Sequence, residues 1–145
     1  MLRSLPFAYP TFSDPDAETI RATVLLSAQE VRLQQLELQI TAYADEQPHA
    51  EWLNEYLDLG LNLACHAGER CLNALQTSWI RRLYHTLREA ALNTRASSHW
   101  RALCLDYLYQ PYFVLQQLYK TNPASHSQLC SLTHEFRTID RCCHR

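Results

Sequence analysis

Length, composition and charge already narrow what this chain can be. Its 145 residues suffice for one domain with a single core. With 47% hydrophobic and 19% charged residues, the chain has the balance of a globular protein, which excludes a disordered or low-complexity chain. The formal net charge is -2, so no basic face is expected to coat a phosphate backbone, and nucleic-acid binding is disfavoured. The apolar runs are too short for a transmembrane helix, so no membrane partner is expected.

Six cysteines raise the question of disulfide bonds. They are Cys65, Cys71, Cys104, Cys130, Cys142 and Cys143. The first ten residues hold one Arg and two prolines but no apolar stretch typical of a signal peptide. Cys-x-x-Cys pairs are absent, which removes the thioredoxin and zinc-ribbon motifs. We therefore predict a cytoplasmic protein with reduced thiols.

The apolar residues predict a helical fold. Leu occurs 24 times, whereas Val and Ile together occur 7 times, and β-branched residues favour strands over helices. Two glycines are too few for a series of tight hairpins. We predict an all-α chain, a single domain over residues 1–145 folded as an antiparallel bundle of about five helices.

The first half of the chain contains two expected helices after an extended N-terminal arm. The arm covers residues 1–14 and contains two prolines. Pro15 suits the first turn of a helix that continues to about Tyr43. A second helix follows, in which Gly60 either weakens the helix or lets a neighbouring helix approach closely. Gly68 is the expected break after this helix.

The second half contains three more expected helices. One has its apolar face from Leu72 to Ala90, and the next begins after a cap at Ser97 or Ser98. Pro111 is expected to kink that fourth helix, because its ring removes one backbone donor. The last helix is expected to run to about Arg141, which leaves residues 142–145 as a frayed tail.

No catalytic motif is present, so we predict a protein that is not an enzyme. The chain lacks a Gly-rich phosphate loop, a nucleophile elbow and an HExxH helix. A di-iron bundle needs two Glu-x-x-His pairs, and the chain has one, interrupted by Pro48.

One constellation indicates a metal site. His126, Cys130 and His134 are spaced four residues apart, which places them on one stripe of the last helix, away from its apolar face. Three residues over two turns span about 12 Å, so one ion can use only two of them. Cys130 and His134 are the first candidates, and Cys142, Cys143 and His144 are further candidates if the tail folds back. Such ligands suit a single zinc, iron(II) or copper(I) ion. The stripe also fits an ordinary polar helix face or a contact with a partner.

Aromatic residues crowd the fourth helix. Those we single out for an interface are Trp100, Tyr109, Tyr112 and Phe113. Core packing explains most of them, but a surplus around Pro111 is typical of a groove or a dimer surface.

Three stretches of the chain together resemble a known family. They are EYLDLGLNLAC (Glu55 to Cys65), QTSWIRRLYHTLREAA (Gln76 to Ala91) and SSHWRALCLDYLYQPYFVLQQL (Ser97 to Leu118). The most particular part is HWR-x-x-CLD, and the chain is similar here to the FagA-type proteins, small products of a Fur-regulated operon in pseudomonads. That operon also encodes an iron-independent fumarase and a manganese superoxide dismutase. The resemblance implies a cytoplasmic protein made under iron limitation, and it transfers no functional residue.

Two functions remain open from the sequence. The first is a helical accessory protein of the iron-limitation and oxidative-stress response that acts by protein interaction or by binding a metal ion. The second is a metal-free interaction module, such as a secretion chaperone, an immunity protein or an antiactivator. Both imply a protein partner or a homodimer.

Overall fold

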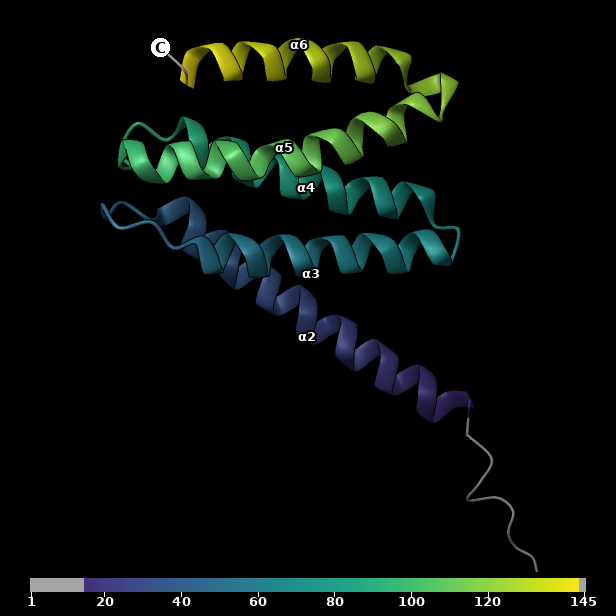
Figure 1. Ribbon diagram of the computed structural model, residues 1–145. Helices are drawn as coiled ribbons and strands as arrows, with labels where there is room; N and C mark the ends of the chain where they lie inside the picture. The colour runs from purple at the N-terminus through teal and green to yellow at the C-terminus, as the bar shows by residue number, and fades with distance from the viewer. Residues whose placement is uncertain (1–14, 144–145) are drawn as a thin grey trace, which may run out of the picture. The chain divides into compact units, whose positions relative to one another are not determined.

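The computed structural model describes residues 15–143, and every regular element within them is a helix (Figure 1). The elements are α2 (Pro15–Ala42), α3 (Ala50–Glu69), α4 (Asn73–Leu92), α5 (Ser98–Lys120), the short 3₁₀ helix η2 (Pro123–Ser125) and α6 (His126–Cys143). The predicted all-α class is confirmed. The predicted arm, residues 1–14, lies outside the described residues. Among the helices described, none combines the length and the apolar character needed to span a bilayer.

The chain divides into two compact units, Met1–Arg32 and Leu33–Arg145. The described part of the first unit is the beginning of α2. The second unit contains the end of α2 and all the later helices, and it holds the core.

The second unit is built on α4. Contacts join α4 to α3, α5 and α6, and short turns make successive helices run in opposite directions (Figure 1). The largest fully buried side chains are Leu33, Leu36, Ile40, Leu53, Tyr56, Ile80, Leu83, Tyr84, Leu87, Trp100, Leu105 and Leu108. Burying about twelve large side chains is the main favourable contribution to this unit's stability.

Gly60 allows α3 and α4 to approach closely. A Cβ atom at this position would lie 2.2 Å from Cδ2 of Leu83, which is itself fully buried. The second of the two roles expected for Gly60 is therefore confirmed. The conformational cost of a helical glycine is offset here by closer packing of the two helices.

The turn between α3 and α4 ends the helix in a different way from the one predicted. Gly68 lies within α3, and the left-handed residue is Cys71, with a φ of 59°. Its N–H donates to the Gly68 carbonyl at 3.0 Å, and the Leu72 N–H donates to the Ala67 carbonyl at 2.9 Å. These two bonds form a Schellman motif, in which the left-handed position normally belongs to glycine.

Replacing Cys71 with glycine is therefore expected to stabilise the protein. A non-glycine residue in the left-handed conformation costs about 1 kcal/mol, and glycine avoids this cost. Glycine also makes the unfolded chain more flexible, which lowers the free energy of unfolding and cancels part of the gain. We expect a net increase of about 0.5 kcal/mol in the free energy of unfolding, measured by urea titration. Cys71→Ala serves as the control, because alanine removes the thiol but keeps the strain. An equal gain in both variants would contradict this account of the turn.

Local signals define both ends of α5, and its beginning lies where predicted. The side chain of Ser97 accepts a hydrogen bond from the Trp100 N–H at 3.1 Å and so caps the helix. The helix continues through the buried Pro111, and Figure 1 shows its second half bending away from the line of the first. It ends before Asn122, whose side chain caps η2 by accepting from the Ala124 N–H.

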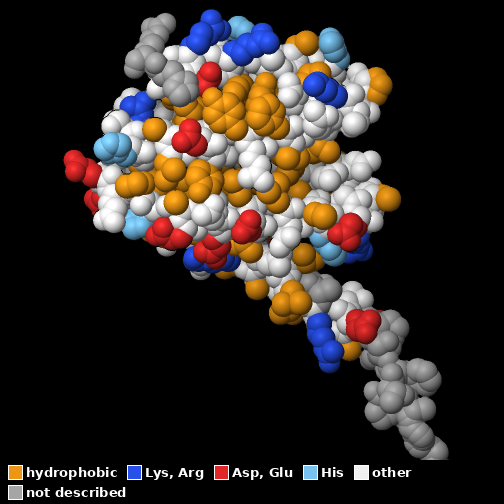
Figure 2. All heavy atoms as spheres, viewed as in Figure 1, with side chains coloured by type: hydrophobic (Ala, Val, Ile, Leu, Met, Phe, Trp, Pro, Cys, Tyr) orange, Lys and Arg blue, Asp and Glu red, His pale blue; other side chains and the backbone are white. Residues whose placement is uncertain are grey.

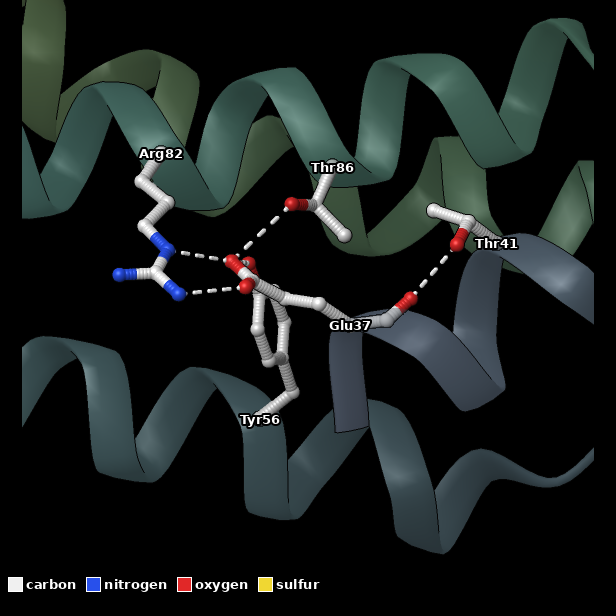
Figure 3. A network of polar contacts seen from close by, with 5 residues as sticks. All are labelled: Glu37, Thr41, Tyr56, Arg82 and Thr86. Carbon is white, nitrogen blue, oxygen red and sulfur yellow. Dashed lines mark hydrogen bonds and ion pairs between the residues drawn. The ribbon is translucent and has the colours of Figure 1, made fainter. Parts of the chain in front are cut away.

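A partly buried carboxylate joins three helices of the second unit (Figure 3). The Glu37 carboxylate of α2 accepts from Arg82 of α4, with Nε at 2.7 Å and Nη2 at 2.6 Å. It also accepts from the Tyr56 hydroxyl of α3 at 2.8 Å and, at 3.4 Å, from the hydroxyl of Thr86. Burial beside this carboxylate raises the pKa of Tyr56, so its hydroxyl remains a donor. Four donors saturate the carboxylate, and its role is structural.

A second cluster of the same type joins α6 to α4. Glu135 accepts a hydrogen bond from the Tyr84 hydroxyl at 2.8 Å. Nη1 of Arg88 donates to both carboxylate oxygens of Glu135, each at 3.1 Å. Each cluster thus pairs one carboxylate with one tyrosine and one arginine, and both arginines belong to α4. These contacts fix α6 in position, and with it the residues predicted to bind metal.

Candidate functional site

The predicted stripe lies on the outer face of α6. His126, Cys130 and His134 are all exposed, whereas Leu132, Phe136 and Ile139 of the same helix are buried. The predicted orientation of the stripe, away from the core, is therefore confirmed. The structure brings two of the three side chains together, because Sγ of Cys130 lies 3.6 Å from Nε2 of His126.

This separation matches two ligands of one tetrahedral ion. Zinc binds a thiolate at about 2.3 Å and an imidazole nitrogen at about 2.05 Å, and a tetrahedral angle then places the two ligand atoms about 3.6 Å apart. The observed distance between Cys130 and His126 is 3.6 Å. The fixed rise of the helix therefore places this pair at a suitable separation for one metal ion.

The surroundings of His134 differ from those of His126. A cleft of about 400 Å³ between α5 and α6 is lined by Cys130, His134, Lys120 and Arg137, together with Gln116, Leu129 and Thr133. Its two cationic side chains oppose the entry of a metal cation. His126 does not line this cleft. The structure thus favours His126 as the partner of Cys130, whereas the sequence prediction placed His134 first.

The described part of the tail, Cys142 and Cys143, does not fold back toward the stripe. Instead of ending at about Arg141, α6 continues to Cys143, so Cys142 and Cys143 lie about 18 and about 20 Å from Cys130 along the helix axis. Cys142 is exposed, and the half-buried Cys143 lies with Sγ 3.9 Å from the Ala91 carbonyl oxygen of α4. His144 lies outside the described residues. Within residues 15–143, no three His, Cys, Asp or Glu side chains are grouped to hold one metal ion.

The predicted aromatic interface is corrected at two of its four positions. Trp100 is fully buried and Tyr112 is 6% exposed, so both belong to the core of the second unit and offer no surface to a partner. Tyr112 stacks on Phe136 of α6, with ring centroids 3.8 Å apart, and the Tyr109 hydroxyl donates to Asp140 at 2.6 Å. Phe113 is 53% exposed. In Figure 2, hydrophobic side chains gather across the middle of the visible face, below the edge where α6 lies.

Two other titratable side chains have clear structural explanations. Burial of Cys104 in the core raises the pKa of its thiol to about 12, which keeps it protonated and unreactive at neutral pH. Partial burial and the nearby Arg88 lower the pKa of His85, so its imidazole is neutral at pH 7. Neither residue is placed against a nucleophile or a metal ligand among the described contacts.

A second, polar cleft has no signal in the sequence. It has a volume of about 750 Å³ and lies where the beginning of α4 meets the end of α5, η2 and the beginning of α6. Arg81 and Tyr119, which meet in it, are 38 residues apart in the chain and belong to no motif. Only their positions on the exposed flank of α4 and the end of α5 bring them together.

Comparisons with family models, with curated proteins and with solved structures found no match for this chain.

Proposed function

We propose that this chain is a non-catalytic accessory protein that binds a soft divalent metal ion through Cys130 and His126. The separation of 3.6 Å between Sγ and Nε2 carries this proposal, because it equals the spacing of two ligands around tetrahedral zinc. Both side chains are exposed on one helix, so an ion reaches them without any rearrangement of the core. The cytoplasm is the compartment in which such a thiol stays reduced.

Two ligands complete only half of a tetrahedral site. A second copy of the chain, related by a twofold axis, supplies another Cys130 and another His126, which together make a Cys₂His₂ set. We therefore propose that two chains share one ion, which would couple metal binding to self-association. The resemblance to iron-regulated proteins adds a setting for this activity, the response to iron limitation, and that setting depends on the resemblance alone.

Zinc affinity in four matched proteins tests the ligand assignment. We expect Cys130→Ser and His126→Gln each to weaken zinc binding by roughly tenfold or more, and His134→Gln to leave it unchanged. The measurement is a competition titration of the reduced protein against a chromophoric chelator. Because zinc displaces the thiol proton, the affinity is also expected to fall as the pH is lowered.

The controls separate this pair from the other thiols. Cys142→Ser removes an exposed thiol on the same helix and is expected to bind zinc as the native chain does. Retention of zinc by Cys130→Ser would refute the proposed ligand pair. One zinc ion on a monomer, lost in Cys130→Ser, would keep the ligands but refute the shared ion.

A second candidate function, a metal-free interaction module, is favoured by the exposed apolar side chains of α2. Ile20, Val24 and Val31 are 63%, 61% and 55% exposed and lie within an arc of about 40° on the helix. A stripe with this spacing is typical of a helix that packs against another helix. Association through this stripe would persist in a metal chelator, whereas association through zinc would not.

A further inference from the structure

The cleft at the beginning of α4 has an excess of hydrogen-bond donors. Its described lining contains one cation, Arg81, and no carboxylate. The other polar groups come from Asn73, Gln76, Thr77, Tyr119, Thr121, Asn122, Ser125 and Gln128. A volume of about 750 Å³ is within the range of small-molecule sites.

The Tyr119 hydroxyl is restricted to the role of donor. Arg81 donates to its oxygen twice, from Nε at 3.2 Å and from Nη2 at 2.9 Å. A hydroxyl has two acceptor positions and one hydrogen, so these two bonds fill its acceptor capacity and leave the hydrogen to be donated. Tyr119 is 7% exposed, and its hydroxyl hydrogen has no acceptor among the described contacts. Because Tyr119 lines the cleft, a ligand oxygen placed there can accept this hydrogen.

The backbone adds further donors to the same cleft. Asn73 and Ala74, in the first turn of α4, line it, and the residue before them, Leu72, provides no side-chain cap. The first N–H groups of a helix have no acceptor within the helix, and they carry its partial positive charge. No acidic residue in the first turn of α4 offsets that charge.

A carboxylate in an adjoining cleft is already engaged by other donors. Glu135 lines a smaller adjoining cleft of about 290 Å³ that shares Arg81 and Tyr119 with the first. Its oxygens accept hydrogen bonds from the Tyr84 hydroxyl and from Arg88, and the Arg88 guanidinium balances its charge. It therefore leaves Arg81 available to an anion.

We propose that this cleft binds a small molecule through an oxyanion group, a phosphate or a carboxylate. The anion lies between Arg81, the Tyr119 hydroxyl and the first N–H groups of α4, and the amides of the lining bind the rest of the ligand. This site is independent of the metal site on α6, because Cys130 and His126 do not line it.

A titration of the full chain followed by ¹⁵N NMR tests the site. Inorganic phosphate and malonate are added separately at constant ionic strength, to about 50 mM. At this concentration, an anion that binds with a millimolar dissociation constant occupies nearly all of the sites. We expect saturable shifts of the Asn73 and Ala74 amide signals. Tyr119→Phe and Arg81→Gln are each expected to weaken binding by at least about fivefold, whereas Arg95→Gln, which removes an exposed arginine outside the cleft, leaves it unchanged.

Each outcome of this titration is informative. Saturation by phosphate alone, or by malonate alone, supports the site and identifies the group it accepts. Shifts that never saturate, or that are the same in Tyr119→Phe as in the native chain, would overturn the proposal. Circular dichroism of each variant confirms that it folds, and Tyr119→Phe keeps the buried ring, so the comparison does not depend on Arg81→Gln alone.

Discussion

Replacing Trp100 with alanine is expected to lower the free energy of unfolding by about 3–5 kcal/mol, the largest effect of any single substitution considered. Trp100 is fully buried, and its ring meets Tyr43 and Trp52 at centroid distances of 5.0 and 6.1 Å. Its Nε1–H also donates to the Ile40 carbonyl at 3.2 Å. That carbonyl belongs to the last turn of α2, where no helical donor remains, so the tryptophan caps this helix end.

The substitution Trp100→Phe separates the two contributions. Phenylalanine keeps most of the buried area but cannot donate to Ile40, so we expect a loss of about 1–2 kcal/mol. Urea unfolding of both variants provides the comparison, with the slope of the transition used to confirm two-state behaviour. A loss below about 1 kcal/mol for Trp100→Ala would mean that Trp100 is not in the core.

The second large effect is expected for Glu37→Gln. The amide keeps the shape of the carboxylate but turns one acceptor oxygen into a donor, which faces Arg82 or Tyr56, both donors themselves. The side chain of Glu37 is 16% exposed and that of Arg82 is 39% exposed, so solvent screens part of the loss. We expect the free energy of unfolding to fall by about 2–3 kcal/mol.

Two comparisons show whether this effect comes from the cluster. Glu89→Gln removes an exposed carboxylate on α4 and is expected to change stability by less than about 0.5 kcal/mol. In the double variant Glu37→Gln with Arg82→Gln, the second substitution is expected to cost much less than it does alone, because its partner is already lost. Strict additivity of the two losses would contradict the pairing shown in Figure 3.

Local chemistry explains why the helices were predictable. Pro15 at the beginning of α2, the Ser97 cap of α5 and the stop at Asn122 each depend on neighbouring residues in the chain, so their signals are present in the sequence. The turn at Cys71 was missed because its left-handed residue is not the glycine that usually marks it.

Long-range pairing explains most of what the sequence did not reveal. Glu37 and Arg82 are 45 residues apart, and Arg81 and Tyr119 are 38 residues apart, so no spacing rule connects them. The sequence predicts a surface position for Trp100 because its helix carries aromatic residues on several faces, and only the packing of α5 decides which of these faces are buried. The stripe on α6 was predictable because it depends on helix geometry alone, but the choice of His126 over His134 required the side-chain positions.

The measurement that tests the central proposal most directly is native mass spectrometry of the reduced, zinc-loaded chain. The proposed pair of Cys130 and His126 predicts a species of two chains and one zinc ion, which disappears in a chelator and is absent from Cys130→Ser. Chains that retain no zinc, or a Cys130→Ser variant that retains as much zinc as the native chain, would contradict it.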